Sequence, residues 1–167
     1  RLPHPHAQCA GCAPRDVLLT TRPDGKPTLR SASPAWQFNL THSDGWALIA
    51  LHPQWELGID LEIHKPWPHM NDLPDSVFST NELITWHATT PAKRANALYA
   101  SWTRKEACLK AVGTGLMTPP DQLDLGLAPT PARGHWLGPK GRSVEWLDLG
   151  DLPLAAPHSA CLAWIQH

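Results

Sequence analysis

The stretch ELGIDLEIHK, residues 56–65, decides how this chain folds. Apolar and polar residues alternate along it, so that one side carries Leu57, Ile59, Leu61 and Ile63, and the other carries Glu56, Gly58, Asp60, Glu62 and His64. A period of two predicts a β-strand with one buried face. Acidic residues are uncommon in strands, and two carboxylates side by side on one face repel each other unless a cation lies between them.

Asp60 and Glu62 therefore have two interpretations. They could form the solvated face of an edge strand, where charged side chains discourage pairing with other chains. Alternatively, a third carboxylate from a neighbouring helix would complete an all-oxygen site suited to Mg²⁺, which takes a few carboxylates together with water and substrate phosphates. Four cationic or titratable side chains would then be available for phosphate charge, namely Lys26, Lys105, Lys110 and His42.

The composition limits the classes of protein to be considered. The 167 residues are enough for one domain with a sizeable core. The formal net charge of −1 gives no basic field for nucleic acid or a membrane surface. No apolar run approaches the roughly 18–20 residues of a membrane span, and no stretch resembles a signal peptide. We expect a cytoplasmic protein with reduced thiols.

The four cysteines do not form a disulfide framework. Cys108 and Cys161 stand singly in apolar segments and are predicted to be small buried hydrophobes. A second group combines two histidines with a CxxC pair, namely His4, His6, Cys9 and Cys12. This group could bind zinc or could belong to a frayed terminus rich in Pro and Ala. We predict a loosely ordered segment over 1–20 and a single domain over 21–167.

Strands are predicted on both sides of the turn signal Asp44-Gly45, as QFNLTHS (37–43) and WALIAL (46–51). WALIAL is apolar throughout, which predicts a strand covered on both faces. It lies so close in the chain to residues 56–65 that the two strands are predicted to form an antiparallel pair. Later strand-like pieces are QLDLGL, SVEWLDL and SACLAWI, and the Pro-rich residues 128–140 are predicted to be a loop.

Two main helices are predicted, over 80–88 with Ser79 or Thr80 as N-cap, and over 92–112 with Gly113 and Gly115 ending it. The fold class is therefore α+β, with mostly antiparallel strands. An apolar stripe on the longer helix is formed by Leu98, Trp102, Leu109 and Val112.

Glu106 and Lys110 lie four residues apart on the flank of this stripe. They could form an ordinary ion pair on a solvated face, or both could point into a cleft. Lys105 falls within the stripe, so its ammonium must reach solvent or an anionic partner.

Five motifs in order resemble the 4′-phosphopantetheinyl transferases, and specifically their Sfp-type monomeric branch. They are DGKP (24–27), FNLTHSDGWALIAL (38–51), LGIDLE (57–62), FSTNEL (78–83) and WTRKEACLKAVGTGL (102–116). The resemblance implies a pseudo-symmetric pair of α+β halves, with the first half incomplete here, and a monomer.

The resemblance also implies an activity and a site. Such enzymes transfer the phosphopantetheine arm of coenzyme A to a serine of an apo acyl or peptidyl carrier protein and release adenosine 3′,5′-bisphosphate. The metal-binding carboxylates, for Mg²⁺, would be Asp60, Glu62 and Glu106. The coenzyme A contacts would be Lys26, Thr41, His42 and Lys110. Glu106 would also act as the base toward the serine, and Lys110 would assist the leaving group.

Two other classes of function remain open. One is a non-catalytic module that binds carrier proteins and has lost the nucleotide lobe. The other is an unrelated Mg²⁺-dependent nucleotide hydrolase. That class does not explain why the chain carries both GKP and THS in the order seen here.

Overall fold

The computed structural model describes residue 13 and residues 16–30, 36–66, 72–127 and 132–166. The strands are β1 (Leu19–Thr21), β2 (Pro27–Leu29), β3 (Gln37–Ser43), β4 (Trp46–His52), β5 (Glu56–Ile63), β6 (Arg133–Leu137), β7 (Ser143–Asp148) and β8 (His158–Ile165). The helices are α2 (Pro74–Val77), α3 (Thr80–Ala88) and α4 (Pro91–Val112), with short 3₁₀ turns at Gly115–Met117, Pro120–Gln122 and Pro139–Gly141.

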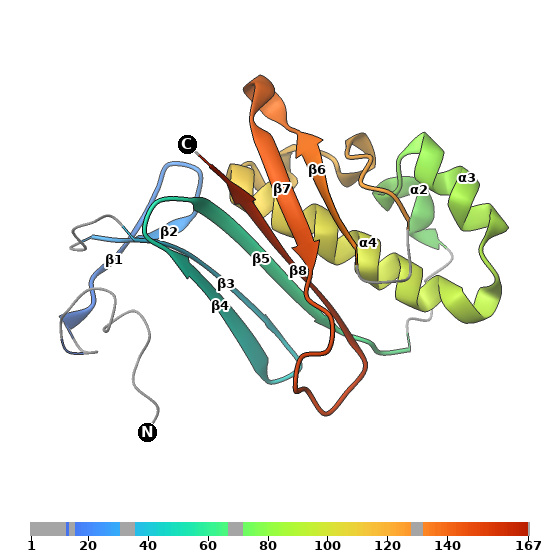
Figure 1. The fold of residues 1–167 in the computed structure, drawn as a ribbon, viewed down its shortest axis with the longest axis horizontal. Coiled ribbons are helices and arrows are strands. Elements are labelled where there is room, and N and C mark those ends of the chain that lie inside the picture. The colour runs from blue at the N-terminus through green and yellow to red at the C-terminus, as the bar shows by residue number, and fades with distance from the viewer. Residues whose placement is uncertain (1–12, 14–15, 31–35, 67–71, 128–131, 167) are drawn as a thin grey trace.

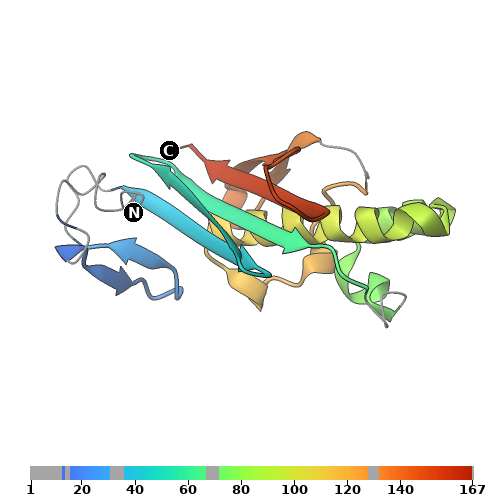
Figure 2. The ribbon, with the colours of Figure 1, turned by 90° about the horizontal axis from the view of Figure 1, so that it is seen from below.

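The main sheet has the strand order β5-β8-β7-β6, and all its pairs are antiparallel. β3 and β4 form a hairpin beside β5, whereas β1 and β2 form a second hairpin at the opposite end of the molecule from α2 and α3 (Figures 1 and 2). The fold class is α+β with antiparallel strands and two main helices, as predicted.

The predicted pairing of the two central strands is wrong. β4 pairs with β3, and β5 pairs with β8 from Glu56↔Ile165 to Ile63↔His158. The turn between β3 and β4 consists of Asp44 and Gly45, whose φ angles are 48° and 81°. A two-residue turn with both φ angles positive matches the twist of a hairpin, so it fixes β4 to β3 and leaves β5 free for another partner.

β4 is also less covered than its sequence predicts. Trp46 is 40% exposed and Ile49 is 38% exposed, so WALIAL is not buried on both faces. β5 is the strand with both faces covered. Asp60 is only 4% exposed, so its carboxylate does not lie on a solvated face, whereas Glu62 is half-buried.

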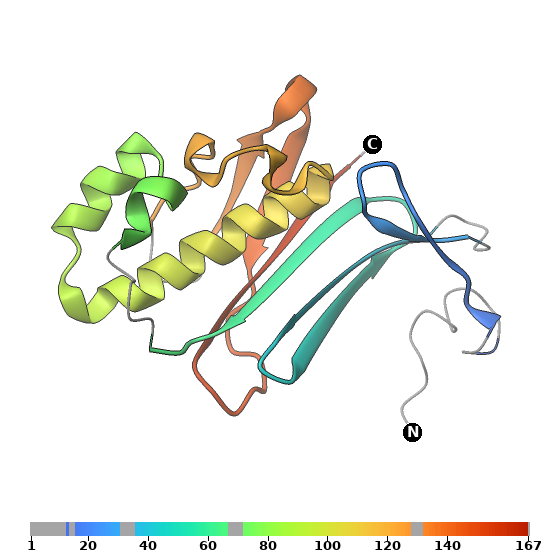
Figure 3. The same ribbon diagram turned by 180° about the vertical axis from the view of Figure 1, so that it is seen from behind.

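Helix α4 runs across the face of β5 and β8 (Figure 3). Gly58 makes the close approach of α4 to β5 possible, because a Cβ at this position would lie 1.9 Å from Ala107 O and 2.4 Å from Ala111 N. On the opposite face of β5, Leu61 and Ile63 pack against Leu48 and the loop before β8. Gly58 thus sets the distance between the strand and the helix.

Gly58→Ala is expected to lower the free energy of unfolding by about 3 kcal/mol, the upper end of the usual cost of overpacking a core. The added methyl would meet helix backbone, which cannot rotate away. Urea unfolding measures the loss. Gly134→Ala is the matched control and should cost less, because its Cβ would meet only the Trp146 ring, at 2.7 Å. Equal stability of Gly58→Ala and the parent would contradict this account of the close approach.

Both predicted helices are present. Ser79 and Glu82 form a capping box at the start of α3, and Gly113, with φ 81°, ends α4. The anionic partner of Lys105 is Glu82, whose Oε2 lies 2.5 Å from the Lys105 Nζ. The same ammonium donates hydrogen bonds to the carbonyl oxygens of Val77, Pro120 and Leu123. Lys105 therefore joins α4 to three other segments.

The later part of the chain differs from its prediction in two places. Residues 122–127 form no strand, although Leu123, Leu125 and Leu127 are buried as their alternation predicts. Residues 133–137, predicted to be loop, form β6. The strands of SVEWLDL and SACLAWI are confirmed as β7 and β8.

Cys108 and Cys161 are confirmed as buried free thiols. The candidate zinc ligands His4, His6, Cys9 and Cys12 lie outside the described residues. So does most of the segment 1–20, and the domain boundary near residue 20 stays a prediction; β1 begins at Leu19. In the part of the chain that the structure describes, no helix is both long and apolar enough to cross a membrane.

Candidate active site

A cavity of about 410 Å³ lies between β3, β5 and α4. Its lining is Leu40, Thr41, His42, Asp60, Glu62, Trp102, Glu106 and Lys110. Six of these residues were singled out from the sequence as site residues, namely Thr41, His42, Asp60, Glu62, Glu106 and Lys110. The structure brings them together from three separate elements.

The local sequence explains why these side chains meet. Asp60 and Glu62 are two residues apart on β5 and so point to the same face, which is the face that α4 covers. Glu106 and Lys110 are four residues apart and share one flank of α4. Lys110 Nζ lies 2.6 Å from Asp60 Oδ1 and 3.3 Å from Ile59 O. This contact supports the interpretation of Glu106 and Lys110 as cleft residues.

Asp60 has one satisfied and one unsatisfied carboxylate oxygen. Its Oδ1 accepts hydrogen bonds from Lys110 and from Thr41 Oγ1, the latter at 3.1 Å. Its Oδ2 is buried and accepts no hydrogen bond from the residues that the structure describes. A buried carboxylate oxygen without a donor is costly, and such an oxygen is suited to a cation.

Burial raises the pKa of both Glu62 and Glu106 above the ordinary carboxyl value. The negative charge of Asp60 raises both pKa values further, and that of Glu62 also raises the pKa of Glu106. The ammonium of Lys110 lowers both. The three carboxylates therefore interact electrostatically, with Lys110 as their shared counter-charge.

Lys110→Met is expected to raise the pKa of Glu106 further, because the variant loses the charge that lowers it. The pKa of Glu62 should rise for the same reason. The side-chain carboxyl ¹³C shifts, followed through a pH titration, measure both values. Lys93→Met is the matched control, since Lys93 is exposed near the start of the same helix. Unchanged carboxyl pKa values in Lys110→Met would contradict the shared counter-charge.

The carboxylates are not arranged as a finished metal site. Among the described residues, no three side chains of His, Cys, Asp or Glu are placed to hold one metal ion. Asp60 is bonded to Lys110, and Glu62 Oε2 lies 3.2 Å from Ser43 Oγ. The carboxylate ligands nevertheless fit a hard divalent cation, because three of them line one cavity and, within the described part of the chain, Asp60 Oδ2 accepts no hydrogen bond.

Lys26 lies apart from this cavity. It is 7% exposed, and its Nζ lies 2.7 Å from Leu57 O and 3.1 Å from Glu56 Oε2. Arg22 Nη1 donates to the other oxygen of Glu56 at 2.6 Å. Burial lowers the pKa of Lys26. The contact between Lys26 and a coenzyme A phosphate stays a prediction. In the structure the ammonium of Lys26 is paired with the Glu56 carboxylate.

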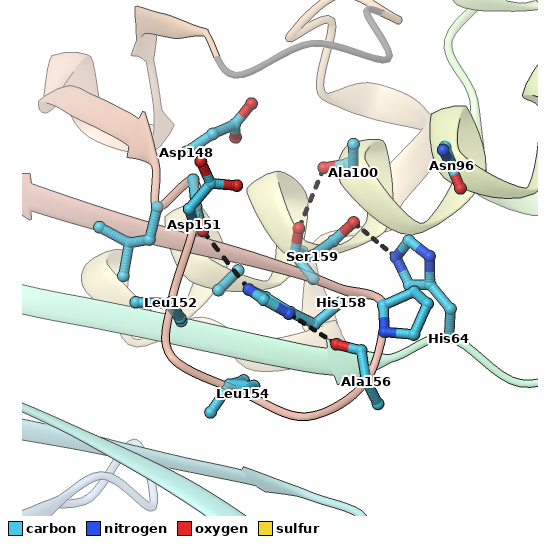
Figure 4. A pocket seen from close by; sticks show the side chains of 15 residues that line it. His64, Asn96, Ala100, Asp148, Asp151, Leu152, Leu154, Ala156, His158 and Ser159 are labelled. Carbon is cyan, nitrogen blue, oxygen red and sulfur yellow. Dashed lines mark hydrogen bonds between the residues drawn. The ribbon is translucent and has the colours of Figure 1, made fainter.

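A second cavity, of about 430 Å³, lies on a different flank of α4 (Figure 4). Several of its polar groups have partners in the fold. His64 Nε2 lies 2.8 Å from Ser159 Oγ, His158 Nδ1 lies 2.9 Å from Ala156 O, and Asp148 accepts hydrogen bonds from Arg104. None of the site residues predicted from the sequence lines this cavity.

Sequence reasoning missed Asn39, Ser43 and Trp102 as parts of the site. Ser43 contacts Glu62, and the side chain of Trp102 interacts with the same carboxyl group and lowers its pKa. A signal was present, because Asn39, Thr41 and Ser43 are polar at every second position of β3. That pattern predicts a common direction for the three side chains.

Comparison with known proteins identifies the family of this chain. Residues 56–155 match the 4′-phosphopantetheinyl transferase superfamily. The Synechocystis sp. protein slr0495, named as a candidate 4′-phosphopantetheinyl transferase, is 38% identical over 107 residues, which are 63% of this chain and 43% of that protein.

Two further relatives carry the same kind of name. The 4′-phosphopantetheinyl transferase AcpT of Salmonella typhi is 36% identical over 89 residues, 53% of this chain and 46% of AcpT. The 4′-phosphopantetheinyl transferase HetI of Nostoc sp. is 32% identical over 122 residues, 72% of this chain and 51% of HetI. The chain thus spans about half the length of the relatives it matches.

Proposed function

Because the chain belongs to the 4′-phosphopantetheinyl transferase superfamily, we propose that it transfers the 4′-phosphopantetheine arm of coenzyme A to a serine of an apo carrier protein. The observation that carries the proposal is the single cavity onto which Asp60, Glu62, Glu106 and Lys110 converge. This arrangement offers carboxylates for a divalent ion, a base, and a cation for phosphate, all within one space.

The reaction places clear demands on these side chains. The serine oxygen forms a bond to the phosphorus that carries the pantetheine arm, and the bond from that phosphorus to the bridging oxygen breaks. Adenosine 3′,5′-bisphosphate leaves with the bridging oxygen. Glu106 takes the serine proton, directly or through water, and its raised pKa makes it a stronger base than an exposed carboxylate.

Lys110 supplies positive charge to the diphosphate. Its ammonium is 2.6 Å from Asp60 in the structure, and its side chain lines the cavity, so it can exchange the carboxylate for a phosphate oxygen. Phosphoryl transfer depends mainly on positioning and on neutralising charge. Thr41 and His42 line the same cavity and would contact coenzyme A. Lys26 lies outside the cavity beside Glu56, and its contact with a coenzyme A phosphate would be made there.

Asp60, Glu62 and Glu106 would hold Mg²⁺. When bound, the ion would supply positive charge to the diphosphate oxygens. Asp60 Oδ2 accepts no hydrogen bond from the described residues, which leaves this oxygen available to a cation.

The proposal is tested by incubating the 167-residue chain with coenzyme A, Mg²⁺ and an apo acyl or peptidyl carrier protein. Mass spectrometry should then show the carrier gaining the mass of one phosphopantetheine arm, and adenosine 3′,5′-bisphosphate should appear in equal amount. Carrier binding without a mass gain would favour a non-catalytic module. Nucleotide turnover without a carrier would favour a hydrolase.

A further inference from the structure

β3 is attached to β5 by side chains. The main-chain partner of β3 is β4, and that of β5 is β8. Asn39, Thr41 and Ser43 extend from β3 toward β5 and contact it at successive positions. We call these three residues the side-chain ladder.

The first two members of the ladder are buried. Asn39 Oδ1 accepts a hydrogen bond of 2.8 Å from the Ile59 N–H and is 7% exposed. Thr41 Oγ1 donates to Asp60 Oδ1 at 3.1 Å and is 6% exposed. Asn39 therefore holds the backbone just before Asp60, and Thr41 holds the carboxylate itself.

Ser43 holds both backbone and carboxylate with one hydroxyl. Its oxygen accepts from the Ile63 N–H at 3.1 Å, and its proton is directed to Glu62 Oε2 at 3.2 Å. A hydroxyl has a single proton to donate, so the Ser43 proton is committed to Glu62. The carboxylate is thereby fixed relative to the backbone next to it.

We propose that the side-chain ladder orients the carboxylates of Asp60 and Glu62 toward a divalent cation, with Asn39, Thr41 and Ser43 as positioning residues. The proposal rests on the proposed function, because it concerns the same two carboxylates. Hydrogen bonds from outer side chains restrict the rotation of metal-binding groups, and losing one typically costs 10- to 100-fold in metal affinity.

The test uses Ser43, because its bond to the Ile63 N–H is only partly buried, whereas removing Asn39 would leave the fully buried Ile59 N–H unpaired and threaten the fold. Mn²⁺ is titrated into the 167-residue chain without coenzyme A and followed by electron paramagnetic resonance. Ser43→Ala is expected to raise the Mn²⁺ dissociation constant about 10-fold or more. Ser43→Thr keeps the hydroxyl and should restore most of the affinity.

Ser76→Ala is the matched control. It also removes a serine hydroxyl, but one that lies on α2 and donates to Leu73 O at 2.9 Å. If the parent and Ser43→Ala bind Mn²⁺ with equal affinity, the proposed role of the side-chain ladder is overturned, while the proposed metal site stands. A parent chain that binds no Mn²⁺ would overturn the proposed metal site as well. A loss of affinity that Ser43→Thr does not restore would show a general structural effect and also overturn the ladder.

Discussion

The Glu106→Gln variant is expected to lose about 10³-fold or more in the rate of phosphopantetheine transfer, while it folds normally. Glutamine cannot accept the serine proton, and a well-placed general base contributes roughly 10²- to 10⁴-fold. The variant also loses one of the three charges available to the metal. The rate is measured from the mass gain of the carrier protein under single-turnover conditions.

The fold should survive this change because Glu106 is only partly buried and lines the cavity. Circular dichroism and the unfolding midpoint should match those of the parent. Glu145→Gln is the matched control, since Glu145 lies half-exposed on β7, away from the cavity, and its variant should keep the parent rate. A Glu106→Gln rate within a few-fold of the parent rate would remove Glu106 from both of its proposed roles.

The Lys105→Met variant is expected to lose about 3–5 kcal/mol in the free energy of unfolding. Its ammonium is fully buried and paired with Glu82, whose side chain is 1% exposed. Removing one partner of such a pair leaves the other charge buried and uncompensated, which costs about that amount. The variant also leaves three carbonyl oxygens without their donor. Urea unfolding measures the loss.

Two variants control for the loss of charge. Lys93→Met makes the same change at an exposed position of α4 and should stay within about 0.5 kcal/mol of the parent. Adding Glu82→Gln to Lys105→Met removes the unpaired carboxylate and should recover part of the stability. A Lys105→Met chain as stable as Lys93→Met would mean that this ion pair does not join α4 to its neighbours.

The site was more predictable from the sequence than the pairing of the strands. Alternation along residues 56–63 fixes the direction of Asp60 and Glu62, and helical spacing fixes that of Glu106 and Lys110. Alternation does not determine which edge of a strand pairs with which partner. The nearby β4 was therefore predicted to pair with β5, whereas the distant β8 does so.

The sequence also does not identify the partners in ion pairs between residues far apart in the chain. The motif of Lys26 predicts a phosphate contact, which stays a prediction; its partner in the structure, Glu56, lies thirty residues away in the chain and was not predicted. Lys105 was predicted to need an anion, and only the folded chain identified that anion as Glu82. The sequence shows which charges need partners; the packing of the elements decides which partners they obtain.

The central claim is that Asp60, Glu62 and Glu106 share one divalent cation. A crystal structure of the chain grown with Mn²⁺, with an anomalous difference map at the manganese edge, tests it most directly. We predict one strong peak within coordination distance of all three carboxylates, with Lys110 displaced from Asp60. A Lys110–Asp60 ion pair that stays intact, with no peak on these side chains at saturating Mn²⁺, would contradict the account.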